Sequence, residues 1–154
     1  MSSTNASIAR GLRTLIRACA DDERTLEHER KFVDAGRAAS LTRFAHERQR
    51  FISDLEKLAA PGRDHRHSGS WAELLREAGR NVWVTAAGRN NGDAITVCRH
   101  SRARTEMHYD EALQRPWPDE LRRVIEAQRH RLHDETDELN QLLFYRPRSI
   151  DSTS

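Results

Sequence analysis

Six charged or amide side chains stand where apolar residues are expected on the core-facing stripes of predicted helices. Apolar residues recur at spacings of three and four, the period of one helix face, and each stripe is interrupted near its midpoint. The interrupting residues are Asp22, Glu23, Arg48, Arg102, Gln128 and Glu135. A buried charge must pair with an opposite charge or bind an ion, because moving an unpaired charge out of water costs a large free energy. The pattern therefore predicts a polar core layer.

The height of the interruptions favours an internal position for this layer. In an antiparallel bundle the midpoints of the helices lie at about the same height, so the six residues can meet. The alternative is that they sit at the rim of the bundle, where long side chains reach water. For an internal layer, we expect Glu23 and Glu135 to form bidentate pairs with Arg48 and Arg102.

Other reactive residues do not indicate a catalytic site. Asp64, His65 and His67 form a possible metal cluster, but their loop is flanked by glycine and holds ligands poorly. Cys19 and Cys98 fall on apolar stripes and are expected to be reduced core thiols. No Ser, His and Asp occur in a recognisable catalytic order, and no phosphate-binding loop is present. We therefore predict no catalytic residue.

The stripes predict five helices, at about residues 6–33, 41–59, 71–87, 94–113 and 121–143. Gly36 is a candidate stop for the first helix, and Asp93 is a candidate N-cap for the fourth. Residues 1–5 are expected to be a disordered lead and residues 145–154 a flexible tail, which leaves residues 6–144 as one domain. The predicted fold class is all-α, an antiparallel four-helix bundle with the helix at 71–87 inserted between core helices 2 and 3.

The totals of the chain agree with this architecture. Of its 154 residues, 36% are hydrophobic and 32% are charged, and the net charge of +2 argues against a dedicated nucleic-acid binder. The first residues lack the apolar run of a signal peptide, and no stretch is apolar enough to span a membrane. We expect a cytoplasmic protein without nucleic-acid or membrane partners. An apolar face on the extra helix, formed by Trp71, Leu75, Val82 and Trp83, predicts a homodimer contact.

Several segments together resemble a known family. They are Leu12-Arg-Thr-Leu-Ile16 with Cys19 and Asp21-Asp-Glu23, Arg48-Gln-Arg-Phe51 with Leu55, the helix start at Ser70-Trp71, Ala94-Ile95 to Cys98, Tyr109 to Leu113, and Gln128 to Leu132. Over residues 12–143 the chain resembles an uncharacterised bacterial family of ferritin-like proteins, a domain of unknown function. The resemblance implies a ferritin-like four-helix bundle and a dimer. In that design Glu and Glu-x-x-His ligands hold two metal ions.

The chain departs from this pattern at the positions of the metal ligands. Arg99 and Arg102 stand where the family has acidic residues, and Thr136 stands where it has a His. Residues 47–50 and 126–129 read Glu-x-x-Arg instead of Glu-x-x-His, and Arg cannot be a ligand. Three histidines lie off the stripes and are expected at the surface: His46, His130 and His133.

We therefore expect a non-catalytic ferritin-like bundle protein of unknown biochemical function, with an ion-pair layer in place of a metal site and no cofactor. A stress-related role is a further expectation. One alternative is a di-iron-type protein that holds iron or manganese with Glu23, Glu106, Glu135 and a nearby His. The other is a helical module that docks a protein partner.

Overall fold

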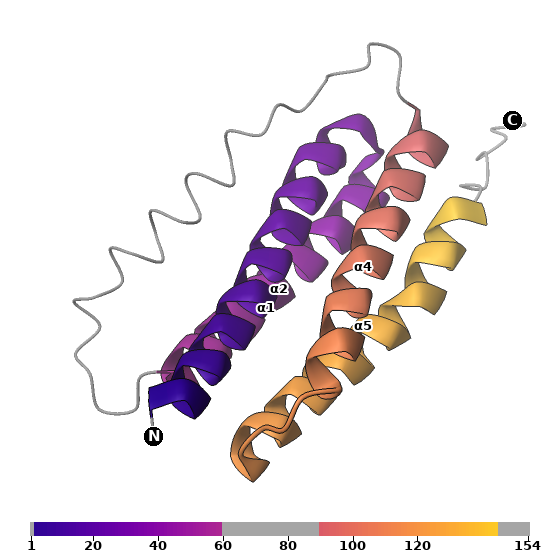
Figure 1. The fold of residues 1–154 in the computed structure, drawn as a ribbon. Coiled ribbons are helices and arrows are strands. Elements are labelled where there is room, and N and C mark those ends of the chain that lie inside the picture. The colour runs from indigo at the N-terminus through magenta and orange to yellow at the C-terminus, as the bar shows by residue number, and fades with distance from the viewer. Residues whose placement is uncertain (1, 60–89, 145–154) are drawn as a thin grey trace, which may run out of the picture.

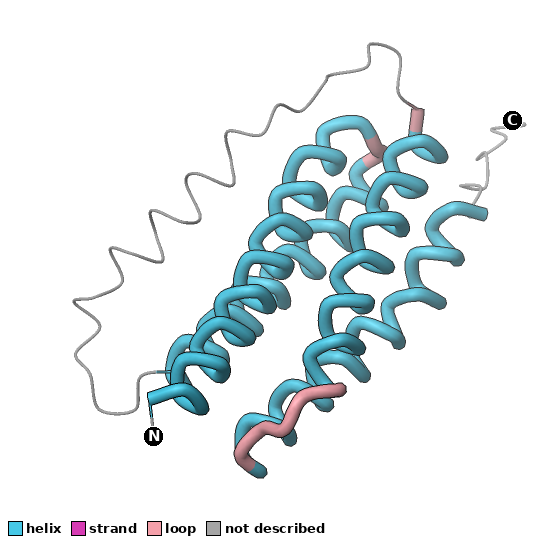
Figure 2. The backbone as a smooth tube through the Cα atoms, viewed as in Figure 1, coloured by secondary structure: helices cyan, strands magenta, loops and turns pink. Residues whose placement is uncertain are grey.

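The computed structural model describes residues 2–59 and 90–144, and every regular element in these two ranges is helical (Figures 1 and 2). Helix α1 spans Ser2–Glu29 and a short 3-10 helix, η1, spans Arg30–Phe32. Helix α2 spans Ala35–Ala59, α4 spans Asn91–Leu113 and α5 spans Asp119–Phe144. The prediction of an all-α protein is confirmed for these residues. The predicted extra helix at 71–87 lies outside them, as do Asp64, His65 and His67.

Two predicted helix ends differ from the structure because the capping residues lie elsewhere. Asp34 accepts a hydrogen bond from the backbone N–H of Arg37 at 3.0 Å, so α2 begins before Leu41 and Gly36 belongs to its first turn. At the start of α4, Asn90 is the N-cap and forms a capping box with Asp93, which lies three residues inside the helix. Gly36 is therefore not a stop signal, and Asp93 is not the cap itself.

Helix α1 begins at Ser2, within the segment 1–5 for which a disordered lead is predicted. The chain contains no Pro or Gly before Gly11, so no residue there breaks the helix, and α1 extends back to Ser2. The C-terminal end of α1 is tighter than expected, since it closes in η1 before Val33 becomes extended.

The four long helices pack side by side as a bundle (Figure 1). Helix α1 packs against α2 and α4, and α5 packs against α4 and α2. Among the described residues the backbones of α1 and α5 make no close approach, so these two helices lie diagonally across the bundle. None of the described helices is long and apolar enough to cross a membrane.

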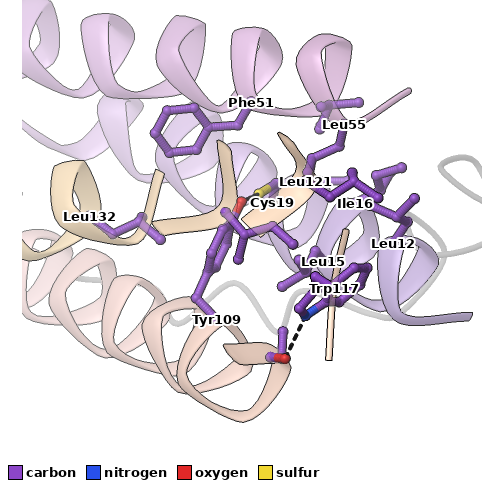
Figure 3. Close-up of a cluster of buried hydrophobic side chains, with 14 residues drawn as sticks. Leu12, Leu15, Ile16, Cys19, Phe51, Leu55, Tyr109, Trp117, Leu121 and Leu132 are labelled. Atoms are coloured by element: carbon purple, nitrogen blue, oxygen red, sulfur yellow. Dashed lines mark hydrogen bonds between the residues drawn. The ribbon is translucent and has the colours of Figure 1, made fainter. Parts of the chain in front are cut away.

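The apolar core is divided into two clusters along the bundle axis. One cluster, drawn in Figure 3, includes Leu15, Phe51, Tyr109 and Ile125. The other includes Leu26, Leu41, Phe44, Ile95 and Leu139. On each helix the two clusters are separated by one stretch of sequence, which contains every predicted polar position except Gln128. Gln128 lies between Ile125 and Leu132, within the first cluster. The core is therefore interrupted at a single level.

Gly11 is required by a close approach at one end of the bundle. The indole of Trp117 lies over this glycine, and a Cβ added at Gly11 would meet its Cη2 at 2.6 Å. The indole is held in place because its Nε1 donates to the carbonyl of Ala112 at 2.7 Å (Figure 3). The ring therefore cannot move aside without losing a buried hydrogen bond.

We predict that Gly11→Ala lowers the free energy of unfolding by about 1–3 kcal/mol, because the added methyl overpacks the site. Gly36→Ala is the matched control, since the nearest atom to its Cβ is at 3.5 Å and the position is helical. That substitution should stabilise the protein by about 0.4–1 kcal/mol. Urea denaturation of both variants measures the difference, and equal effects at the two glycines would contradict the packing described here.

Candidate functional site

Arg48 lies at the centre of the polar level and is one of the largest fully buried side chains, with 1% of its surface exposed. It projects from the middle of α2 between the two apolar clusters. Two carboxylates face it from other helices, Asp22 on α1 and Glu135 on α5, and both are fully buried. One guanidinium therefore meets two acids inside the bundle.

All three nitrogens of the Arg48 guanidinium donate hydrogen bonds. Its Nε donates to Asp22 Oδ2 at 2.6 Å, its Nη1 donates to Glu135 Oε1 at 3.0 Å, and its Nη2 donates to Glu135 Oε2. The second oxygen of Asp22 accepts from the Ser101 hydroxyl at 2.6 Å, and the Phe51 ring lies beside the guanidinium at 5.5 Å. The network joins α1, α2, α4 and α5 through side chains of fixed geometry.

A further acid borders this network. Glu47 is buried and accepts from Arg131 Nε at 2.6 Å and from Arg131 Nη2 at 3.2 Å. The side chains of Glu47 and Glu135 also hydrogen-bond to each other. A hydrogen bond between two carboxyl groups requires a proton on one of them. The group thus contains three carboxyls, Asp22, Glu47 and Glu135, and only two guanidiniums, those of Arg48 and Arg131.

Burial and charge together decide which carboxyl holds this proton. Burial raises the pKa of Glu135 to about 8, although Arg48 opposes the shift, and Glu47 raises it further. Burial also acts to raise the pKa of Glu47, but its hydrogen bonds from Arg131 and Glu135 outweigh burial and leave that pKa lowered. Burial acts to lower the pKa of Arg48, and the two facing acids overcome it, so Arg48 stays charged. The proton therefore resides on Glu135.

A second, uncharged chain of hydrogen bonds lies next to this layer. Gln128 accepts from the Tyr109 hydroxyl at 2.6 Å and donates to the Phe51 carbonyl at 3.2 Å. Cys19 Sγ lies 3.2 Å from the same hydroxyl (Figure 3). Burial raises the pKa of the Cys19 thiol to about 12 and that of Tyr109 well above its usual value. Both groups remain neutral, which makes Cys19 a poor nucleophile.

Arg102 and Glu23 do not join the Arg48 network, contrary to the predicted pairing. Arg102 is buried, but it donates to Glu106 Oε2 at 2.5 Å, one turn along α4, and to the Leu132 carbonyl at 3.0 Å. Glu23 is only half-buried and accepts from Gln49 at 2.6 Å. The reason is rotational: Glu23 lies one residue beyond Asp22, which turns it about 100° away from the core-facing direction.

Several members of the site were not singled out from the sequence. These are Glu47, Ser101, Tyr109 and Arg131. Tyr109 has an apolar ring that fits the hydrophobic side of α4, and its hydroxyl makes it a polar member of the site. Ser101 and Arg131 lie beside the stripes and show no periodic signal. Glu47 is buried beside Arg131 of α5, a contact between helices that the local sequence around Glu47 does not indicate.

The alternative metal ligands are not brought together. Glu23 faces Gln49, Glu135 faces Arg48, and Glu106 faces Arg102 and His133, whose Nδ1 lies 3.0 Å from Glu106 Oε1. Within residues 2–59 and 90–144, no three His, Cys, Asp or Glu side chains are placed to hold a metal ion. Glu23, Glu106 and Glu135 therefore each face a different partner instead of one another.

The remaining predicted histidines lie at the surface. His46 and His130 are exposed, and His130 lies 3.7 Å from Asp134 on its own helix. His133 is exposed as well, although it contacts Glu106. The predicted interface residues Trp71, Leu75, Val82 and Trp83 lie outside the residues that the structure describes.

Comparisons with known proteins add no family to this description. No family model matches the chain, no curated protein matches it, and no solved structure matches it.

We predict that Arg48→Met lowers the free energy of unfolding by about 3–5 kcal/mol, because Asp22 loses its buried cation. Arg43→Met is the matched control on the same helix. Arg43 pairs with Glu138 at 2.6 Å, but 54% of its side chain is exposed, so the loss should be about 0–1 kcal/mol. Chemical denaturation at neutral pH compares the two variants. A similarly small loss of unfolding free energy for both would mean that Arg48 is exposed to solvent instead of buried.

The protonation of Glu135 predicts a pH dependence of stability. Because its folded pKa of about 8 exceeds its ordinary value of 4.5, the folded state binds the proton more tightly than the unfolded state. This contribution is fully present below pH 4.5 and is lost as the pH rises through about 8. Thermal unfolding between these values should give a falling Tm for the wild type, and Glu135→Gln, which keeps the neutral shape, should flatten that slope. If Tm falls with pH as steeply in Glu135→Gln as in the wild type, other titrating groups cause the pH dependence.

Proposed function

We propose that this chain is a non-catalytic, ferritin-like helical bundle protein in which a buried ion-pair layer occupies the level of a metal site. One observation carries the proposal: the guanidinium of Arg48 lies at the centre of the bundle, and each of its three nitrogens donates to Asp22 or Glu135. A permanent cation at this level repels metal ions and occupies the carboxylates that would bind them.

The order of side-chain partners supports an antiparallel ferritin-like arrangement of α2 and α5. Arg37 near the start of α2 donates to the carbonyl of Leu142 near the end of α5, and Arg48 contacts Glu135. Further along α2, the Phe51 carbonyl accepts from Gln128. As the residue number increases along α2, the residue number of the contacting partner on α5 decreases. The two helices therefore run in opposite directions.

The layer itself supports a structural role instead of chemistry. Its charged members are buried among apolar clusters, and its nearest thiol, Cys19, is kept protonated by burial. A general acid or nucleophile must reach a substrate. A buried network of this kind instead specifies which helices meet and in which register, a use of buried polar groups that is known from helical assemblies.

One contact favours metal-dependent oxidation as the competing function. Glu106 and His133 approach to 3.0 Å across α4 and α5, and they are a carboxylate and an imidazole, the ligand types of di-iron sites. The same carboxylate is also bonded to Arg102 at 2.5 Å, which lowers its availability as a ligand. We therefore rank this function second.

Metal analysis tests the proposal directly. We expect protein purified without a metal-binding tag to contain far less than one iron, manganese or zinc per chain, before and after incubation with each ion. Near-stoichiometric metal that disappears in Glu106→Gln would replace the proposal with metal-dependent chemistry. Glu111→Gln serves as the control, because Glu111 is an exposed acid on the same helix.

The homodimer through Trp71, Leu75, Val82 and Trp83 also stays part of the proposal. It is supported by the apolar character of these residues, which exceeds what a peripheral helix needs. A contact of this kind should be insensitive to salt, because apolar burial is not screened by ions.

A further inference from the structure

The surface charges of the bundle are divided between its two halves. Helices α1 and α2 lie on one side and α4 and α5 on the other (Figure 1). On α1 and α2, Asp21 and Asp54 are the exposed acids, and they are outnumbered by six exposed basic side chains. These are Arg10, Arg13, Arg17, Arg43, Arg50 and Lys57. The outer surface of this half is therefore basic.

The opposite half has the reverse composition. On α4 and α5, Arg104 and Arg123 are the exposed Arg residues, against seven exposed acids; Arg122, Arg129 and Arg131 are partly exposed, and each is paired with an acid. The seven exposed acids are Asp93, Glu111, Asp119, Glu120, Glu126, Asp134 and Asp137. The net charge of +2 for the whole chain conceals this separation, because the two halves largely cancel.

The faces are complementary in sign. Opposite charges on two surfaces steer their encounter and fix their orientation, whereas two like faces repel. We propose that the basic α1–α2 face of one copy docks on the acidic α4–α5 face of a second copy. This inference rests on the surface charges and does not depend on the function proposed for the buried layer.

The size of each face suits such a contact. Two adjacent helices of this length present a face about 40 Å long and about 20 Å wide, or roughly 800 Å². A standard stable interface buries about 800 Å² per partner. The face is therefore large enough for a specific contact without help from another element.

A second copy fits these surfaces better than a polyanion does. A nucleic acid would be attracted to the α1–α2 face alone and repelled by the acidic half of the same molecule. A second copy uses both faces. The contact joins different faces of the two copies, so each added copy leaves one basic and one acidic face free. Assemblies larger than a dimer should therefore appear as the concentration rises, unless the contact closes into a ring.

Sedimentation velocity at two salt concentrations tests the docking. At ~20 mM NaCl the wild type should associate beyond the dimer expected from the apolar contact, and this further association should be lost at ~500 mM NaCl, where charges are screened within a few ångströms. Arg10→Glu/Arg17→Glu should associate at least about tenfold more weakly at low salt. Asp134→Lys/Asp137→Lys should do the same from the other face. All four residues are exposed, so the variants should keep the helical circular dichroism of the wild type.

Sedimentation of a mixture of the two variants at low salt is the decisive experiment. Each variant alone has lost most of the charge of one face, but the first keeps its acidic α4–α5 face and the second keeps its basic α1–α2 face, so the mixture should associate again. The charge-preserving Arg10→Lys/Arg17→Lys should behave as the wild type. A wild type that stays monomeric at low salt, a mixture that stays dissociated, or binding of single-stranded DNA in preference to a second copy overturns the proposal. Association that is the same at both salt concentrations and unaffected by either variant would also overturn it and would leave the apolar contact alone.

Discussion

The packing of this bundle depends on the presence of Arg48 inside it. A guanidinium cannot lose its proton under ordinary conditions, so the helices that surround it must supply acids at the same height. Asp22 and Glu135 do so from α1 and α5, at 2.6 and 3.0 Å. Because hydrogen bonds are directional, this requirement sets the rotation of three helices at once, which apolar packing alone does less strictly.

The division of the core follows from this requirement. Apolar clusters fill the bundle on both sides of the ion pairs, and neither reaches across them. The acids outnumber the cations, which leaves a proton on Glu135, and the next chain of polar groups, from Cys19 to Gln128, is neutral. At the level of Arg48, each carboxylate oxygen of Asp22 accepts from a donor.

The surface shows the opposite arrangement. Inside the bundle, charges of both signs are brought into contact, whereas outside most exposed basic residues lie on α1 and α2 and most exposed acids lie on α4 and α5. Pairing is obligatory in the core because desolvation is costly, and it is optional in water because each ion is solvated. A chain can therefore carry a small net charge and still present two strongly charged surfaces.

The sequence by itself determined the helical architecture and the inward direction of Asp22, Arg48, Gln128 and Glu135, because periodicity is a local property of one helix. Only the tertiary structure decided the partners: Arg48 meets Asp22 across α1, Arg102 turns to Glu106 on its own helix, and Glu23 turns to Gln49. Residues such as Ser101 and Arg131 enter the site through the heights and rotations of helices far apart in the chain, which no local pattern encodes. The helix ends at Asp34 and Asn90 likewise depend on side-chain hydrogen bonds that compete with nearby alternatives.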